Sequence, residues 1–302
     1  MDIIKRNQIR ISELAAGSPK LANQALALDW NELQLALEEC VFNQDLSTLP
    51  EKYEPASYFP IKPENAEQEE LYARAFKHGE TLIRDGKTAA FTVAGGQGTR
   101  LGYDGPKGTL PVSPIKNKPL FQLFAEQIHG ISQKYEVSIP WYIMCSPLNL
   151  EATINHFEES NYYGLGKENL KFFAQGVMPA TDFEGNLLLA SQDGLALSPN
   201  GHGGSLKALI DSGSIADMAE RGIEHVSYFQ VDNPLVTILN PLFIGLHELQ
   251  NSDMSSRSLT KTGPFEKLGN FVSIGDRISI IEYSDLPEEK ALEKEEDGRI
   301  KY

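Results

Sequence analysis

Cysteine is scarce in this sequence, with only Cys40 and Cys145 among 302 residues. This excludes a disulfide-stapled fold, because such folds are short chains rich in cysteine. Long apolar runs are also missing, and the longest, Ile139 to Cys145, is far shorter than a membrane span. Residues Met1 to Ile11 carry charges with no apolar stretch after them, which predicts no secretory signal. We therefore expect a cytoplasmic protein that makes no membrane contact and keeps both thiols reduced.

Positive charge is also in short supply, since 27 Lys and Arg residues face 42 Asp and Glu residues. The net charge of -15 repels phosphate backbones, so a non-specific nucleic-acid binder is disfavoured. A small phosphate ligand is still allowed, because a local group of cations and backbone N–H groups can outweigh the global field. Hydrophobic residues make up 41% of the chain, enough for a sizeable core. The sequence gives no indication of the oligomeric state.

The first 86 residues have a mostly helical pattern. Apolar residues at three- and four-residue steps predict one amphipathic helix through Leu26, Trp30, Leu33, Leu37 and Val41. Prolines between Pro50 and Pro63 predict a connector, because proline interrupts helices. A second helix is predicted to end near Gly86. We interpret residues 1–86 as a helical accessory region and residues 87–302 as a separate domain.

From Lys87 onward, short β-rich runs alternate with helical ones. Strands are predicted at 88–94, 140–145, 169–173 and 225–231, and helices at 119–132, 150–159 and 205–221. This alternation predicts an α/β fold with a mixed, mainly parallel sheet and flanking helices. In such sheets ligands bind at the carboxyl ends of the strands, so the loops that follow strands are the candidate sites.

The most informative motif follows the first of these strands and runs Val93-Ala-Gly-Gly-Gln-Gly-Thr-Arg-Leu-Gly102, with Pro106-Lys107 soon after. Three glycines in four residues let backbone N–H groups converge on an anion. A dinucleotide fingerprint would need glycine where Leu101 stands, and a Walker A loop would need Ser or Thr after Lys107. A glycine-rich loop beside Arg100 and Lys107 suits a triphosphate that releases pyrophosphate.

This loop resembles the signature of the UDP-sugar pyrophosphorylases, the eukaryotic-type UTP:sugar-1-phosphate uridylyltransferases. The resemblance continues through Phe172-Phe-Ala-Gln-Gly, Gly201-His-Gly-Gly, Val231-Asp-Asn and Ile281-Glu-Tyr-Ser. Within the family the sequence is most similar to the UDP-N-acetylglucosamine pyrophosphorylases. The resemblance implies a nucleotide-diphospho-sugar transferase fold of the glycosyltransferase-A type. It also implies nucleotide-sugar metabolism, in which UTP and a sugar 1-phosphate give a UDP-sugar and pyrophosphate with Mg²⁺.

The resemblance assigns roles to individual residues. It implies that the nucleotide contacts Val93, Ala94, Gly95, Gly96, Gln175, Gly201 and Asp232, and that Arg100 and Lys107 are catalytic and hold its phosphates. Gln175 would recognise uracil, because its amide has both a donor and an acceptor. Asp232 would bind Mg²⁺. From the residues alone, an aspartate after an inner strand is equally a metal ligand or a turn residue.

Three further residues are implied to contact the sugar: His202, Glu282 and Tyr283. The N-acetylglucosamine enzymes carry Asn where His202 stands, whereas UDP-glucose and broad UDP-sugar pyrophosphorylases carry Gly-His-Gly. We therefore expect either N-acetylglucosamine 1-phosphate or a hexose 1-phosphate as the substrate, with His202 favouring the hexose.

The last residues, Asp297 to Tyr302, stand where the family continues into further substrate-binding segments. We therefore expect a catalytic domain truncated at its C-terminal end. The alternative to an active uridylyltransferase is a non-catalytic module that binds UTP or a UDP-sugar.

Overall fold

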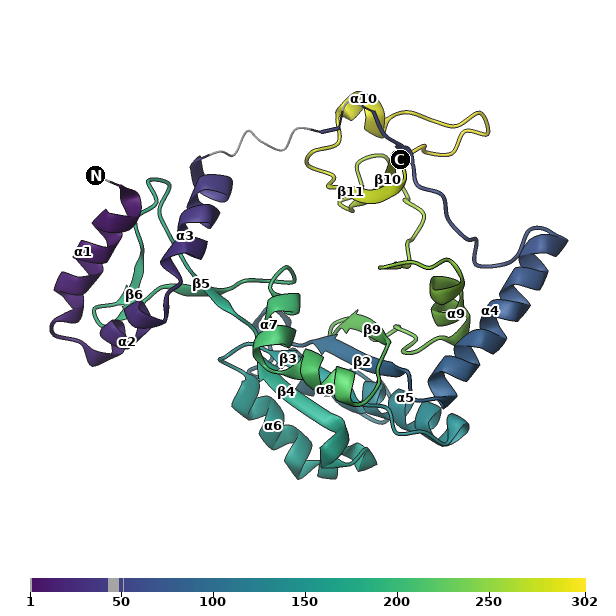
Figure 1. The fold of residues 1–302 in the computed structure, drawn as a ribbon, viewed down its shortest axis with the longest axis horizontal. Helices are drawn as coiled ribbons and strands as arrows, with labels where there is room; N and C mark the ends of the chain where they lie inside the picture. Colours follow the sequence, from purple (N-terminus) through teal and green to yellow (C-terminus); the bar gives the residue numbers. More distant parts are fainter. Residues whose placement is uncertain (1, 43–48, 51) are drawn as a thin grey trace. The chain divides into compact units, whose positions relative to one another are not determined.

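The computed structural model describes residues 2–42, 49–50 and 52–302. Its contacts divide the chain into two units (Figure 1). The first comprises Met1–Ala66, Thr181–Asn186 and Met254–Tyr302, and the second comprises Glu67–Ala180 and Leu187–Asp253. The domain boundary that we placed at residue 86 stays a prediction. Helix α4 (Ala66–Arg84), which we assigned to the accessory region, lies almost wholly within the second unit.

The second unit is built on a four-stranded sheet with the order β4-β3-β2-β9. Its strands are β2 (Thr88–Val93), β3 (Trp141–Cys145), β4 (Leu170–Ala174) and β9 (His225–Gln230). All three strand pairs are parallel, so the predicted parallel sheet is confirmed. Short antiparallel pairs lie outside it: β5 (Val177–Pro179) with β8 (Leu197–Pro199), and β6 (Leu189–Ser191) with β7 (Gly194–Leu195).

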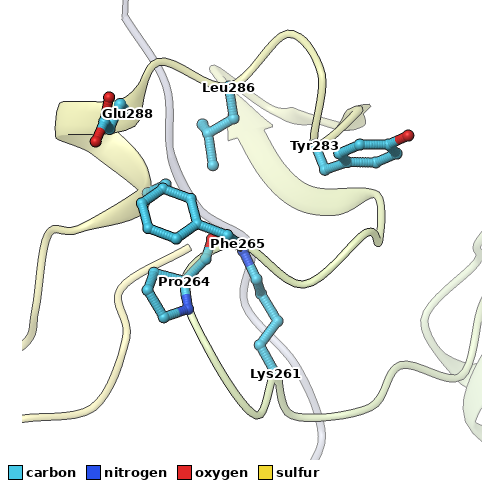
Figure 2. A pocket seen from close by; sticks show the side chains of 7 residues that line it. Lys261, Pro264, Phe265, Tyr283, Leu286 and Glu288 are labelled. Atoms are coloured by element: carbon cyan, nitrogen blue, oxygen red, sulfur yellow. Dashed lines mark hydrogen bonds between the residues drawn. The ribbon is translucent and has the colours of Figure 1, made fainter.

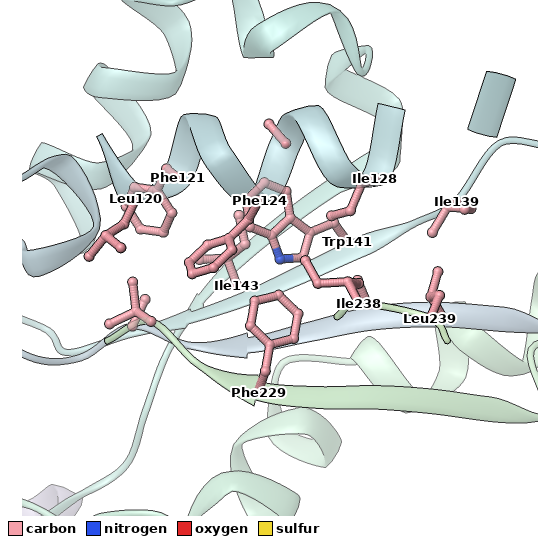
Figure 3. Close-up of a cluster of buried hydrophobic side chains, with 14 of the residues drawn as sticks. Leu120, Phe121, Phe124, Ile128, Ile139, Trp141, Ile143, Phe229, Ile238 and Leu239 are labelled. Carbon is pink, nitrogen blue, oxygen red and sulfur yellow. The ribbon is translucent and has the colours of Figure 1, made fainter. Parts of the chain in front are cut away.

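Helices cover both faces of this sheet (Figure 1). On one face, α5 (Leu120–Tyr135) and α6 (Leu150–Glu159) pack with α4 and α9 (Pro241–Leu249). Figure 3 shows Phe121, Phe124 and Ile128 of α5 pointing toward Trp141 and Ile143 of β3. Strands β2 and β3 are buried along almost their whole length, because alternate residues point to opposite faces and both faces are covered there, whereas β9 is partly exposed.

The other face is covered by two short helices, α7 (Ser205–Asp211) and α8 (Ser214–Glu220). We predicted a single helix over residues 205–221, and this is wrong. Gly213 has a φ of 68°, a left-handed backbone conformation that glycine adopts without strain and that ends α7. The side chains of Ala208, Leu209 and Met218 still bury themselves against the sheet, which explains the helical periodicity.

The N-terminal part of the first unit consists of α1 (Ile3–Ala15), α2 (Pro19–Ala27), α3 (Trp30–Leu37) and a π-helical turn (Glu38–Phe42). The single helix predicted through residues 26–41 is therefore wrong. The Asp29 carboxylate accepts hydrogen bonds from the backbone N–H groups of Asn31 and Glu32, both at 3.0 Å. This N-cap begins a new helix and leaves Leu26 84% exposed at the end of α2.

The C-terminal part of the first unit is a three-stranded antiparallel sheet with the order β1-β10-β11. It pairs β1 (Glu54–Pro55) with β10 (Asn270–Ile274), and β10 with β11 (Arg277–Ile281). A short helix, α10 (Glu288–Ala291), follows. A small apolar cluster holds this part together, and it contains Val272, Ile281, Leu286, Ala291 and Tyr302. No helix among the described residues is long and apolar enough to cross a membrane.

Candidate functional site

The glycine-rich loop leaves the carboxyl end of β2 and folds back on itself. The Gly98 N–H donates to the Gly105 carbonyl at 2.9 Å, and the Lys107 N–H donates to the Gly96 carbonyl at 3.0 Å. At the start of the loop, the Ala94 N–H donates to the Met144 carbonyl at 2.7 Å, which continues the pairing between β2 and β3. The loop is therefore fixed at both ends, with the backbone of Lys107 held beside Gly96.

Gly95 stands where another side chain approaches the backbone closely. A Cβ atom at this position would lie 2.2 Å from Oε1 of Gln175, so any residue other than glycine would force the loop or the Gln175 amide to move. Gln175 directly follows β4, is 6% exposed, and donates its backbone N–H to the Cys145 carbonyl at 2.7 Å. The structure thus brings together the loop after β2 and the predicted uracil-recognising residue after β4.

Lys107 and Asp232 form an ion pair beside this loop. The Lys107 Nζ lies 3.0 Å from Oδ2 of Asp232, and the two side chains are 26% and 50% exposed. The aliphatic stem of Lys107 also runs past Gly96, where a Cβ would lie 3.2 Å from Lys107 Cδ. An ion pair this exposed is weak, so both partners remain available to a ligand.

Asp232 comes just after β9, and a backbone hydrogen bond at the end of this strand holds it close to the glycine-rich loop. The Val231 N–H donates to the Val93 carbonyl at 3.0 Å, which extends the pairing of β9 with β2. We predicted that the strand before Asp232 lies inside the sheet, and this is wrong, since β9 is at the edge of the order β4-β3-β2-β9. The sequence could not show this, because the residue pattern of an edge strand that is covered on one face resembles that of an inner strand.

Arg100 lies in a single 3₁₀ turn, Thr99–Leu101, within the loop. Its side chain is exposed and has no hydrogen-bond or ion-pair partner within the described part of the chain. The structure therefore gives the two predicted phosphate cations different settings: Lys107 is paired, whereas Arg100 is exposed and unpaired among the described residues.

Gly201 and His202 lie in a turn just before α7. Gly201 has a φ of 66°, and the Ser205 N–H donates to the His202 carbonyl at 3.0 Å. The His202 imidazole Nδ1 hydrogen-bonds the Tyr228 hydroxyl of β9, and the two rings meet edge to face. Burial raises the pKa of Tyr228 above its usual value, so the phenol stays protonated. The sequence did not identify Tyr228, because the residue pattern of a strand does not show which of its side chains contacts a loop that is distant along the chain.

Glu282 and Tyr283 belong to the other unit, in the turn after β11. Both are exposed, and the Tyr283 side chain lies near Lys267, whose Nζ is 6.0 Å from the ring centroid. Tyr283 also lines a small cavity of about 170 Å³ with Lys261, Pro264, Phe265 and Leu286. Figure 2 shows its ring extending away from Phe265 and Leu286.

The donor set for a divalent cation is sparse. No group of three or more His, Cys, Asp and Glu side chains within the described ranges could hold a metal ion. Mg²⁺ commonly binds through one or two carboxylates together with substrate phosphates and water. The half-exposed carboxylate of Asp232, next to the glycine-rich loop, fits this mode, in which the nucleotide supplies most of the ligands.

Asn149 is the other residue that sequence reasoning missed. It is fully buried at the start of α6, and its side chain contacts the backbone of the glycine-rich loop. The available signal was weak: an asparagine follows the β3 strand by four residues and precedes a predicted helix.

Comparison with known proteins places this geometry in a family. A sequence model of the UTP–glucose-1-phosphate uridylyltransferase family matches residues 41–302. The chain belongs to this family. It is 35% identical to a probable UDP-N-acetylglucosamine pyrophosphorylase of Schizosaccharomyces pombe over 89% of this chain and 57% of that protein. It is 36% identical to the UDP-N-acetylglucosamine pyrophosphorylase of Saccharomyces cerevisiae over 85% of this chain and 53% of that protein.

Solved structures agree with this assignment. A putative UDP-N-acetylglucosamine pyrophosphorylase from Entamoeba histolytica is 33% identical, with a TM-score of 0.74 over 83% of this chain and 63% of that chain. The UDP-N-acetylglucosamine pyrophosphorylase from Trypanosoma brucei, solved with an inhibitor, is 25% identical. Its TM-score is 0.84 over 100% of this chain and 65% of that chain. The predicted fold and family are confirmed. The chain spans about half the length of the curated relatives it matches.

Proposed function

We propose that this protein is a uridylyltransferase that converts UTP and a sugar 1-phosphate into a UDP-sugar and pyrophosphate. The observation that carries the proposal is the site formed by three strand ends. Gly95 lies against Gln175, and Lys107 is paired with Asp232 directly beside the same loop. Such a site offers an amide for a base, backbone N–H groups and a cation for phosphates, and a carboxylate for a metal.

In this proposal the residues bind and orient the reactants, and no protein nucleophile takes part. A phosphate oxygen of the sugar 1-phosphate attacks the α-phosphorus of UTP in line. The bond from this phosphorus to the bridging oxygen breaks, and pyrophosphate leaves. Lys107 and Arg100 offset the charge that grows on the phosphate oxygens. Mg²⁺, held through Asp232 and the nucleotide, would supply further charge neutralisation.

Gln175 is the proposed uracil contact. Its side chain is held in place by burial and by its position against Gly95. Uracil presents a donor between two acceptors, and an amide can pair with both kinds of group. A fixed amide therefore favours uracil over bases with a different edge.

Two observations bear on the identity of the sugar. The printed names of the relatives favour N-acetylglucosamine 1-phosphate. His202 favours a hexose 1-phosphate by resemblance, and its hydrogen bond to Tyr228 fixes the imidazole. We propose N-acetylglucosamine 1-phosphate as the preferred substrate, with His202 widening the choice. A ratio of kcat/KM between this sugar phosphate and glucose or galactose 1-phosphate decides it.

The test combines two measurements on this chain. Calorimetry with UTP, with and without Mg²⁺, measures nucleotide binding, and a pyrophosphate-release assay with a panel of sugar 1-phosphates measures turnover. Mg²⁺-dependent UTP binding with turnover supports the enzyme. Binding without turnover supports the alternative of a UTP- or UDP-sugar-binding module. Equal affinity for UTP and ATP, or no nucleotide binding, would refute both.

A further inference from the structure

We infer that Asn149 is a positioning residue, which aims the backbone N–H groups of the glycine-rich loop at the phosphates of the nucleotide. Its side-chain amide makes three contacts with the backbone of two strand ends. Oδ1 accepts from the Ser146 N–H at 2.9 Å, and Nδ2 donates to the carbonyl groups of Ala94 at 3.2 Å and Gly96 at 3.4 Å. This inference rests on the proposed function.

The orientation of the Asn149 amide follows from its partners. The Ser146 backbone N–H can only donate, and the carbonyl groups of Ala94 and Gly96 can only accept. A flipped amide would place oxygen against two carbonyl groups and an NH₂ group against an N–H, so every contact would be repulsive. The side chain is fully buried, and water therefore cannot replace a lost partner.

The direction of the carbonyl groups fixes the direction of two N–H groups. In a trans peptide the C=O and N–H bonds are coplanar and point in opposite directions. When Asn149 holds the carbonyl groups of Ala94 and Gly96, the N–H groups of Gly95 and Gln97 must point away from it. Neither N–H donates to an acceptor in the part of the chain that the structure describes. Two free N–H groups in one glycine-rich loop, both directed away from Asn149, offer donors to an anion.

Asn149 also acts together with the catalytic lysine. The Gly96 carbonyl accepts from both the Asn149 Nδ2 and the Lys107 N–H. Loss of the Asn149 contact would therefore release the peptide group that anchors Lys107, and it would also release the N–H groups of Gly95 and Gln97. If Asn149 only began α6, its loss would affect neither the Lys107 anchor nor these N–H groups.

Two variants and one control separate these roles. Asn149→Asp keeps an acceptor for Ser146 but replaces the donor to the two carbonyl groups. Asn149→Ser removes both amide atoms and leaves a smaller side chain. The control is Thr153→Val, because Thr153 is buried in the same turn of α6 and donates its hydroxyl to the Asn149 backbone carbonyl at 2.8 Å. It costs a buried hydrogen bond without touching the loop.

The first measurement is amide hydrogen exchange without ligand. The Gly98 and Lys107 amides are hydrogen-bonded within the loop, and we expect both Asn149 variants to speed their exchange about tenfold, which corresponds to about 1.4 kcal/mol. Exchange in β2 should stay unchanged in the same samples. Thr153→Val should leave the loop amides at the wild-type rate. Unchanged loop exchange in both Asn149 variants would overturn the inference.

The second measurement is UTP affinity by calorimetry, at a temperature where circular dichroism shows each variant folded. We expect about a tenfold loss in both Asn149 variants and none in Thr153→Val. Faster loop exchange with unchanged UTP affinity would overturn the positioning role. If the wild type binds no UTP, the proposed function fails, and the exchange measurement still decides whether Asn149 holds the loop.

Discussion

The glycine-rich loop of the second unit and the Glu282–Tyr283 turn of the first unit present their proposed ligand contacts in different ways. Backbone hydrogen bonds at Ala94, Gly96 and Gly98 fix the loop, and the buried side chain of Asn149 donates hydrogen bonds to its backbone carbonyl groups. In the turn, the Glu282 carbonyl accepts hydrogen bonds from the N–H groups of Asp285 and Leu286. The carboxylate and phenol project outward, and the Tyr283 side chain is 46% exposed.

This difference means that the glycine-rich loop is more preorganised than the Glu282–Tyr283 turn. The proposed nucleotide-binding groups are in position before a ligand arrives, so less ordering is needed on binding. The proposed sugar contacts are single side chains on an exposed turn. Substitutions in the loop should therefore act through geometry and have large effects, whereas substitutions in the turn should each remove one contact.

Lys107→Ala should give the largest effect. We expect kcat to fall by about 10²-fold or more, as for loss of one preorganised charge stabiliser in an active site. Arg100→Ala should act in the same direction, and steady-state pyrophosphate release measures both. Lys116→Ala, which removes an exposed lysine in the loop before α5, is the matched control. Near-normal kcat in both site variants would mean that neither cation takes part.

Gly95→Ala tests geometry without removing any charge. The new methyl group would lie 2.2 Å from Gln175 Oε1, so the loop or the amide must move. A displacement of this size can cost about 10²-fold in kcat/KM. The control is Gly130→Ala in α5, where no atom lies within 4 Å of the added Cβ. That control should leave activity unchanged and stabilise the protein by about 0.5–1 kcal/mol in thermal or denaturant unfolding.

Asp232→Asn tests the proposed metal-binding role of a residue in the same unit as the loop. We expect the Mg²⁺-dependent part of UTP binding to weaken about tenfold, because a carboxylate ligand is replaced by a neutral amide. The fold should be intact, since the Asp232 side chain is half exposed. Asp211→Asn, which breaks another exposed lysine pair, is the control. An unchanged Mg²⁺ requirement in a calorimetric titration would make Asp232 a turn residue only.

Glu282→Gln should have the smallest and most selective effect on the reaction. We expect the KM for the sugar 1-phosphate to rise about tenfold, in line with loss of hydrogen bonds to a charged group. UTP affinity, measured by calorimetry, should not change. Glu296→Gln, an exposed position in the same unit, should match the wild type. A parallel loss of UTP affinity would contradict the division of labour between loop and turn.

Local patterns were sufficient for the four-stranded sheet of the second unit and for α5 and α6, but α9 was not predicted. The bounds predicted for α6 are those observed, and the four predicted strands all form. Periodicity works here because the strands β2 and β3 are buried on both faces, whereas the helices are buried on one. It failed at Asp29 and Gly213, where one capping side chain and one left-handed glycine interrupt a continuous apolar stripe.

The parallel α/β arrangement, the glycine-rich loop after β2 and the family could all be inferred from the sequence. Each of these depends on residues that are neighbours along the chain. The contact of Gly95 with Gln175, the pairing of Lys107 with Asp232 and the hydrogen bonds from Asn149 to the loop became visible in the folded structure. The physical reason is that parallel strands bring their carboxyl ends together from distant parts of the chain, and no local pattern records which side chains then meet.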